Sequence, residues 1–212
     1  MIVRAASTVE PMAEPTRWVT ETGDDHSQWY IDRFRRMAAE GKDLVGEARL
    51  VDAMVPRQAR ILDAGCGTGR LSGELHARGH TVVGVDADGE LVAAARQDHP
   101  GPRYAVADLS ELTLEMLGEA EPFDAALLAG NVMVFVAPGT EVQVLRRVRD
   151  CVTEEGFLIL GFHVDRHLSL QDFDRHAADA GLWVEHRFAT WDLRAWHDDA
   201  DFAVTVMRRE GV

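Results

Sequence analysis

The segment from Asp63 to Gly69 contains the residues whose types and spacing most clearly suggest chemistry. It reads Asp-Ala-Gly-Cys-Gly-Thr-Gly and follows a short apolar run, residues 60–64, that has the composition of a strand. Glycine adopts positive φ and carries no Cβ, so a turn with Gly65, Gly67 and Gly69 brings its backbone close to a bound ligand. A helix that begins after such a turn presents free N–H groups to the same ligand. The turn therefore predicts a site for an adenine-containing cofactor.

Asp86 is the second residue expected in this site. It ends the β-branched run 81–86 and lies 21 residues after Gly65. In dinucleotide-binding folds, a carboxylate at a spacing of about 20 residues accepts hydrogen bonds from the ribose hydroxyls. The alternative is that Asp86 only caps the helix that follows. The agreement of strand, turn and spacing favours the ribose.

The segment 61–69 resembles the first motif of the class I S-adenosylmethionine-dependent methyltransferases almost residue for residue, and the resemblance extends from about residue 26 to the C-terminus. It implies S-adenosylmethionine as the cofactor, with the loop glycines under its methionine part and Asp86 on its ribose. It also implies that Asp108 and Leu109 bracket the adenine and that residues 130–131 lie beside the transferable methyl group. The cofactor-binding residues expected from the motif and the resemblance are Asp63, Gly65, Cys66, Gly67, Gly69, Asp86, Ala87, Asp108, Leu109, Gly130 and Asn131.

Simpler alternatives stay open for some of these residues. Asp108 also has the right place to cap a helix beginning at Ser110, and residues 130–131 are typical of a turn that ends a strand. Cys66 lies between two glycines of the turn, where a small side chain is the expected requirement. A nucleophilic role is disfavoured because no His or Asn partner stands near it in the sequence.

A helical pattern of apolar residues runs from His26 to Ala39, with Ser27 as its expected N-cap. In small methyltransferases of the kind that this chain resembles, an N-terminal helix often covers the cofactor. Tyr30 is therefore an expected cofactor contact, and Arg35 is an expected partner of the methionine carboxylate. The alternative for an aromatic residue at helical spacing is ordinary core packing.

No residue pattern identifies the methyl acceptor. Transfer from a sulfonium requires alignment of the two reactants, and a base is needed only where the acceptor must lose a proton. His163, after the fifth expected strand, is the candidate for such a base, and a polar loop histidine is the alternative. His163 and His167 have a spacing that binds metal on a helix, but their segment is expected to be a loop, so no metal site is expected.

Alternation of strands and helices predicts the fold. The expected strands are residues 60–64, 81–86, 104–107, 123–129 and 157–162, and the helices between them are residues 71–78, 88–97, 110–117 and 141–152. Continuous apolar strands separated by helices predict a Rossmann-like α/β fold, a parallel sheet with helices on both faces. A capping box at Ser169 opens another helix, and the alternating segments 184–191 and 201–207 predict an antiparallel hairpin. The sheet then has seven strands, with the last one antiparallel.

These elements suggest one structural domain. We expect a flexible N-terminal tail over residues 1–25 and a single methyltransferase domain over residues 26–212. Within this domain, residues 26–56 are expected to form a helical lid and residues 57–163 the cofactor-binding core. Residues 164–212 are expected to form the C-terminal helix and hairpin.

The composition narrows the expected partners. The 212 residues include 22 basic and 36 acidic ones, a formal net charge of -14, which disfavours nucleic acid because its binding depends on Lys and Arg neutralising phosphates. No apolar run reaches the roughly 20 residues of a membrane helix, and the N-terminus lacks a secretory signal. A cytoplasmic protein is therefore expected. A small-molecule acceptor is expected because little of the chain remains to form a domain that docks a macromolecule, and the sequence does not determine the oligomeric state.

Two other functions are alternatives for this sequence. A nicotinamide-dependent oxidoreductase predicts Gly-x-Gly-x-x-Gly, but the sixth position here is Arg70, and Asp63 would have no role. A protein that binds S-adenosylmethionine without catalysis is the nearer alternative, because intact glycines and Asp86 predict binding and not turnover.

Overall fold

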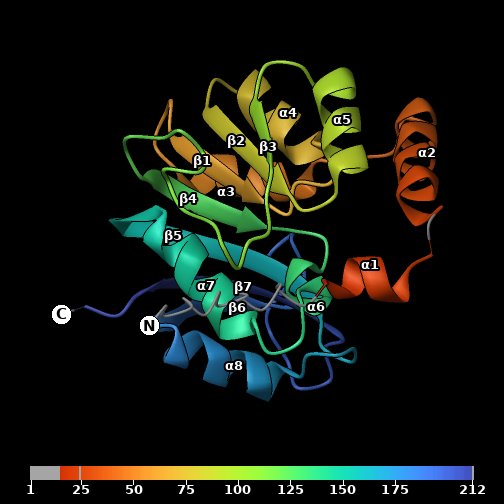
Figure 1. Ribbon diagram of the computed structural model, residues 1–212. Helices are drawn as coiled ribbons and strands as arrows, with labels where there is room; N and C mark the ends of the chain where they lie inside the picture. The colour runs from red at the N-terminus through yellow and green to blue at the C-terminus, as the bar shows by residue number, and fades with distance from the viewer. Residues whose placement is uncertain (1–14, 24, 212) are drawn as a thin grey trace, which may run out of the picture.

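The computed structural model describes residues 15–23 and 25–211, and its centre is a seven-stranded sheet (Figure 1). The strand order is β3-β2-β1-β4-β5-β7-β6, and the pairs from β3 through to β5 are parallel. β7 is antiparallel to both of its neighbours, β5 and β6. The expected Rossmann-like sheet with an antiparallel last strand is thus confirmed.

The strands are β1 (Arg60–Ala64), β2 (Thr81–Asp86), β3 (Arg103–Val106), β4 (Phe123–Leu128), β5 (Val152–His163), β6 (Leu182–Phe188) and β7 (Phe202–Arg209). The helices are α1 (Arg17–Glu21), α2 (His26–Ala39), α3 (Gly46–Met54), α4 (Arg70–Ala77), α5 (Gly89–Asp98), α6 (Val132–Phe135), α7 (Glu141–Asp150) and α8 (Leu170–Asp179).

Helices cover both faces of the sheet because successive side chains of its central strands, which point to opposite faces, are both apolar. On β1, Leu62 packs in one core cluster with side chains of α7 and α8, and Ile61 packs in a second cluster with side chains of α3 and α4. None of the helices in the described part of the chain is both long and apolar enough to cross a membrane.

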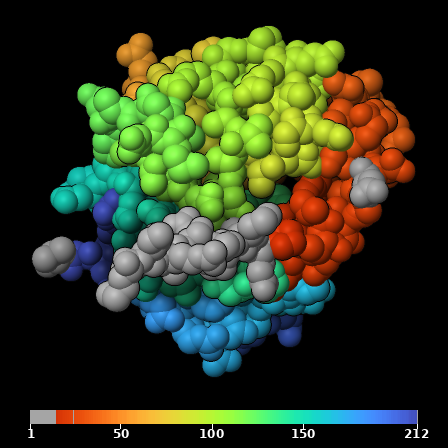
Figure 2. Space-filling model, in the orientation of Figure 1, coloured from red at the N-terminus to blue at the C-terminus, as the bar shows by residue number. Residues whose placement is uncertain are grey.

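Two helices of the N-terminal region lie at one side of the sheet, where α2 contacts α5 and α1 contacts α6 (Figure 1). Figure 2 shows their red and orange atoms against the body of the molecule. The prediction of an unstructured tail is wrong for residues 17–21, which form α1. A helix of five residues is too short to show helical periodicity, so the sequence pattern did not reveal it. Residues 1–14 of the predicted tail lie outside the described residues.

Two local predictions also differ from the structure. Ser27 does not cap α2, whose N-cap is Asp25, because the Ser27 hydroxyl bonds Asp88 instead. Residues 110–117 form successive turns and not a helix. There, the Thr113 hydroxyl accepts the N–H of Met116, a local side-chain bond that competes with helix formation. The short helix α6 was not predicted.

The C-terminal predictions are confirmed. Ser169 caps α8 by accepting the N–H of Asp172, and β6 and β7 form the expected antiparallel pair. β7 lies between β5 and β6, so the hairpin continues the sheet beyond β5.

Candidate functional site

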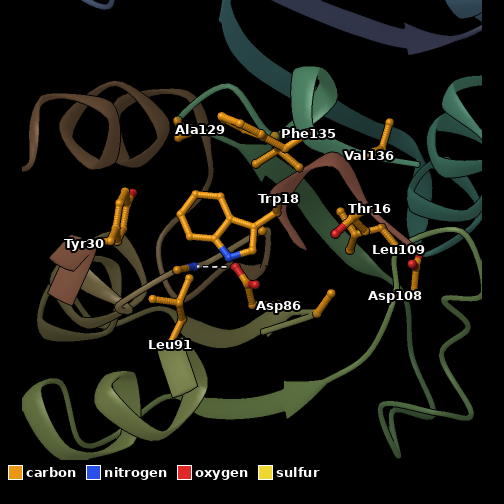
Figure 3. Close-up of a pocket in the computed structure, with 15 residues that line it drawn as sticks. Thr16, Trp18, Tyr30, Asp86, Leu91, Asp108, Leu109, Ala129, Phe135 and Val136 are labelled. Atoms are coloured by element: carbon orange, nitrogen blue, oxygen red, sulfur yellow. Dashed lines mark hydrogen bonds between the residues drawn. The ribbon is translucent and has the colours of Figure 1, made fainter. Parts of the chain in front are cut away.

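One pocket lies beyond the carboxyl ends of β1, β2 and β4, where ligands of open α/β sheets bind (Figure 3). The empty space between its walls is about 670 Å³, including the part that opens to solvent. The residues that line it are Thr16, Trp18, Tyr30, Gly65, Gly67, Asp86, Ala87, Leu91, Asp108, Leu109, Ala129, Gly130, Val132, Phe135 and Val136.

The floor of the pocket is the glycine turn after β1. The N–H groups of Gly65 and Cys66 both donate to the carbonyl of Val85, which fixes the turn against β2. Gly65 has φ +83°, and a Cβ at this position would lie 2.4 Å from the Val132 side chain. Gly67 and Tyr30 both line the pocket, and a Cβ on Gly67 would lie 3.5 Å from a carbon of the Tyr30 ring. The turn therefore leaves space that side chains would fill, as a backbone cradle for a cofactor requires.

Asp86 lies at the end of β2 and lines the pocket with its carboxylate. One carboxylate oxygen accepts the N–H of Gly67 at 2.8 Å, the bond drawn dashed in Figure 3, and the other accepts the N–H of Asp88 at 3.0 Å. Burial raises the pKa of Asp86 to about 6, although these backbone N–H groups act in the opposite direction. The carboxylate is thus positioned by the backbone, and its remaining lone pairs are available to a ligand in the pocket.

Asp63 was expected to contact the cofactor, but the structure has it beneath the turn and not on the pocket wall. Its side chain is 1% exposed and accepts the Ser72 hydroxyl of α4 at 2.6 Å. Burial raises the pKa of Asp63 to about 6, although the Ser72 hydrogen bond lowers it. Asp63 therefore joins β1 to α4 and supports the turn from below.

Cys66 and Gly69 are also absent from the pocket wall. The Cys66 side chain is 7% exposed, and burial raises its pKa well above 9.0, so the thiol is unsuited to nucleophilic attack. Gly69 caps α4 with φ +77°, and a Cβ there would lie 2.8 Å from both Ala95 and Tyr104. Its role in the structure is close packing of the turn against α5 and β3.

Ala87, Asp108 and Leu109, which are expected to bind the cofactor, all line the pocket. One Asp108 oxygen also accepts the N–H of Ser110 at 2.8 Å, so the Asp108 side chain also serves as the local cap that was the alternative interpretation. The cap engages one oxygen, and the second carboxylate oxygen has no partner among the described residues. The two interpretations of Asp108 are therefore compatible.

Gly130 lines the pocket, whereas Asn131 beside it does not. Asn131 has φ +67°, and its side-chain oxygen accepts the N–H of His163 at 2.8 Å. The amide thus joins the end of β4 to the end of β5. Its predicted contact with the ligand is not supported by this position.

Tyr30 of α2 lines the pocket as expected, and burial raises its pKa above the ordinary 10.0. The Tyr30 and Trp18 rings pack edge to face, with their centroids 5.4 Å apart. Arg35, expected beside the methionine carboxylate, points elsewhere: it forms a bidentate ion pair with Asp98 of α5, at 2.8 and 3.0 Å. Arg35 therefore helps to fasten α2 to α5 outside the pocket.

His163 does not line the pocket. Its ring packs edge to face against Phe202 of β7 with the centroids 5.0 Å apart. Among the described residues, no group of three or more His, Cys, Asp or Glu side chains is arranged to hold a metal ion.

Sequence reasoning missed Thr16 and Trp18 of the N-terminal segment and Phe135 and Val136 of the α6 region. The Trp18 indole lies in the middle of the view in Figure 3, and its centroid is 5.5 Å from that of Phe135. Its N–H donates to Asp88 at 2.8 Å. A Trp within a Pro- and Thr-containing segment was the available signal, but nothing in the sequence indicates which surface it contacts.

Comparison with known proteins identifies the relatives of this chain. A family model described as a methyltransferase domain matches residues 61–156. A TehB-like SAM-dependent methyltransferase from Corynebacterium glutamicum has 40% sequence identity and a TM-score of 0.82 over 88% of this chain and 100% of that one.

Two curated relatives match over shorter segments. A malonyl-[acyl-carrier protein] O-methyltransferase from Pectobacterium atrosepticum is 38% identical over 39% of this chain and 31% of its own length. A ubiquinone biosynthesis O-methyltransferase from Sinorhizobium fredii is 32% identical over 46% of this chain and 49% of its own length. This chain therefore matches less than half of each of these two relatives.

Proposed function

Because the chain belongs to the S-adenosylmethionine-dependent methyltransferase family, we propose that it transfers the methyl group of this cofactor to a small molecule bound in the same pocket. The observation that carries the proposal is the meeting of the glycine turn, Asp86 and the pair Asp108–Leu109 on one pocket at the carboxyl ends of the strands. S-adenosylmethionine supplies an electrophilic methyl group on its sulfonium sulfur.

The residues on the pocket wall have the donors and acceptors that such a cofactor needs. The Asp86 carboxylate accepts hydrogen bonds from the ribose hydroxyls, and the backbone of Gly65 and Gly67 supports the methionine part. Asp108 accepts from the exocyclic amine of the adenine, and the backbone N–H of Leu109 donates to a ring nitrogen. Gly130, which also lines the pocket, is assigned to the methyl end of the cofactor, as the family resemblance implies.

The lining of the pocket also limits the mechanism. Among the described lining residues, the ionisable side chains are Asp86, Asp108 and Tyr30. The two carboxylates are assigned to the cofactor, and the raised pKa of Tyr30 keeps its phenol protonated at neutral pH. We therefore propose that the acceptor attacks through a lone pair that needs no deprotonation by the protein, and that the protein acts by alignment and exclusion of water.

A small acceptor is supported by the shape and charge of the molecule. The pocket is partly enclosed, and its walls include the aromatic side chains of Trp18, Tyr30 and Phe135. A formal net charge of -14 opposes approach of a nucleic acid backbone. The name of the ubiquinone biosynthesis relative also refers to a small-molecule acceptor.

The proposal is tested with isotopically methyl-labelled S-adenosylmethionine. The protein is incubated with a cell extract divided into a low-molecular-mass fraction, RNA and protein, and labelled products are identified by mass spectrometry. Label in the low-molecular-mass fraction is expected, with none when Asp86→Ala replaces the wild type. Label confined to RNA or protein, or absent from every fraction despite cofactor binding, contradicts the proposal.

His163 provides a second test of the mechanism. Since its ring packs on Phe202 away from the pocket wall, His163→Ala should leave kcat within about twofold of the wild type and the pH–rate profile unchanged. A loss of 100-fold or more (the contribution typical of a general base) together with a lost limb of the pH profile would restore His163 as the base.

A further inference from the structure

We propose that the hydroxyl of Thr16 is a hydrogen-bonding contact for the purine ring of the cofactor, so that the N-terminal segment contributes directly to the ligand site. The inference rests on the proposed function, since it takes the ligand of the pocket to be S-adenosylmethionine. It adds a binding residue from a segment that precedes the whole Rossmann-like sheet in the sequence.

The first observation is the state of the Thr16 side chain. Its hydroxyl oxygen is buried, yet it has no hydrogen-bond partner among the described residues. Thr16 is the N-cap of α1, where a threonine normally accepts an N–H of the first helical turn, but here the side chain makes no such bond. A buried hydroxyl without a partner is costly, and it is satisfied when a ligand supplies the missing group.

The second observation is the position of Thr16 in the pocket. Thr16 lines the pocket, and in Figure 3 it is drawn on the side where Asp108 and Leu109 lie, with Trp18 between it and Tyr30. Asp108 and Leu109 are the residues proposed to bracket the adenine. The partner that this position offers is therefore a nitrogen of the purine.

The third observation is that residues on both sides of the pocket hold the segment in place. Arg17 donates to the carbonyl of Val136 at 3.1 Å and pairs with Glu141 of α7, whose side chain is only 11% exposed. On the opposite side, the Trp18 indole donates to Asp88 at 2.8 Å. Thr16 is adjacent to Arg17 in the chain, and these two anchors fix its backbone at the pocket. A contact made by a side chain held in this way costs little additional ordering on binding.

The experiment measures binding and needs no acceptor. Calorimetric titration with S-adenosylhomocysteine and with 5′-methylthioadenosine, which lacks the amino-acid part, compares the wild type with Thr16→Val, Thr16→Ala and Thr16→Ser. The matched control is Thr20→Val, the same change at an exposed threonine of the same helix. Circular dichroism verifies that each variant is folded.

Loss of one hydrogen bond that leaves a polar ligand atom without a partner should weaken binding of both ligands by about 5- to 30-fold in Thr16→Val and Thr16→Ala. Thr16→Ser and Thr20→Val should bind like the wild type. Unchanged affinity in Thr16→Val overturns the inference, as does a loss confined to S-adenosylhomocysteine, which would place the contact outside the nucleoside. If the wild type itself binds neither ligand, the result contradicts the proposed function as a whole, and with it the role of Thr16.

Discussion

At the scale of single residues, Asp86 combines burial with a polar environment prepared by the backbone. Its two oxygens already accept the N–H groups of Gly67 and Asp88, yet its pKa is raised to about 6. A ligand whose hydroxyls donate to this side chain binds the ionised form. Binding and proton release from Asp86 are therefore coupled.

The coupling gives a pH prediction. With a pKa of about 6, roughly one-tenth of Asp86 is ionised at pH 5 and nearly all at pH 8, so S-adenosylhomocysteine should bind about 10-fold more weakly at pH 5. Calorimetric titration across this range measures the change. The same shift affects the stability of the ligand-free protein in the opposite direction. The pKa of Asp86 is about 6 in the folded protein and about 4 in the unfolded chain, so the folded state holds this proton more tightly. The contribution of Asp86 to the free energy of unfolding therefore rises as the pH falls from about 6 to 4.

Asp86→Asn is the control for this prediction, because it keeps the shape of the side chain and removes its titration. Its affinity for S-adenosylhomocysteine should be lower than that of the wild type and nearly independent of pH. A pH dependence that persists in Asp86→Asn would point to the other buried carboxylate, Asp63, whose pKa is also raised to about 6.

Gly65 and Gly130 make a matched pair for a stability prediction. Both have φ above +80°, which costs an alanine about 1–2 kcal/mol. A Cβ at Gly65 also meets Val132 at 2.4 Å, whereas a Cβ at Gly130 has no atom within 4 Å. Urea unfolding should therefore show a loss of about 2–4 kcal/mol for Gly65→Ala and about 1–2 kcal/mol for Gly130→Ala. Equal losses would mean that Val132 moves aside at no cost.

At the scale of elements, the carboxylate of Asp88 joins three helices. It accepts the N–H groups of Glu90 and Leu91 as the N-cap of α5, and it also accepts the indole of Trp18 on α1 and the hydroxyl of Ser27 on α2. Burial acts to raise the pKa of Asp88, but hydrogen bonds from Ser27, Trp18 and the backbone lower it below the ordinary value. The ionised form is therefore the one that holds these helices together.

Substitution of Asp88 should separate its two roles. Asp88→Ala removes the cap and both side-chain bonds, and a loss of about 2–4 kcal/mol in the free energy of unfolding is expected. Asp88→Ser keeps a capping oxygen and should recover part of that loss. In both variants hydrogen exchange should accelerate in α1 and α2, since neither can reach Trp18 and Ser27. Exchange in α1 that stays at the wild-type rate would show that the Arg17 contacts alone hold the helix.

The elements also show what the sequence was able to predict. The strands of the sheet and the long helices follow from apolar periodicity and from glycine and capping signals, because their side chains pack within local, repeating patterns. The pocket residues Gly65, Gly67 and Asp86 follow from the glycine motif and its spacing, whereas Asp108 and Leu109 follow from the family resemblance. Ser27, Trp18 and Arg35 were misassigned or missed because their partners Asp88 and Asp98 are 61 to 70 residues away in the chain.

At the scale of the whole molecule, opposite charges are paired at many points of the surface, but acidic residues remain in excess. Pairs such as Arg49–Asp43, with side chains 49% and 60% exposed, contribute little in water. The formal net charge of -14 instead produces repulsion summed over the whole folded chain. The balance between pair attraction and net repulsion determines the response to salt.

We expect repulsion to dominate, so that the protein becomes more stable as salt is added. Raising NaCl from 20 to 300 mM shortens the distance over which exposed charges interact from about 20 Å to about 6 Å, which screens the long-range repulsion. Each exposed pair loses only a fraction of a kcal/mol, because its free energy is small at the outset. Urea unfolding at pH 7.5 should therefore show a free energy of unfolding higher by about 1 kcal/mol at 300 mM. KCl in place of NaCl should give the same slope, since the effect depends on ionic strength and not on a bound ion. A free energy that falls with both salts would show that attraction within the ion pairs, and not the excess of 14 negative charges, controls the stability of this fold.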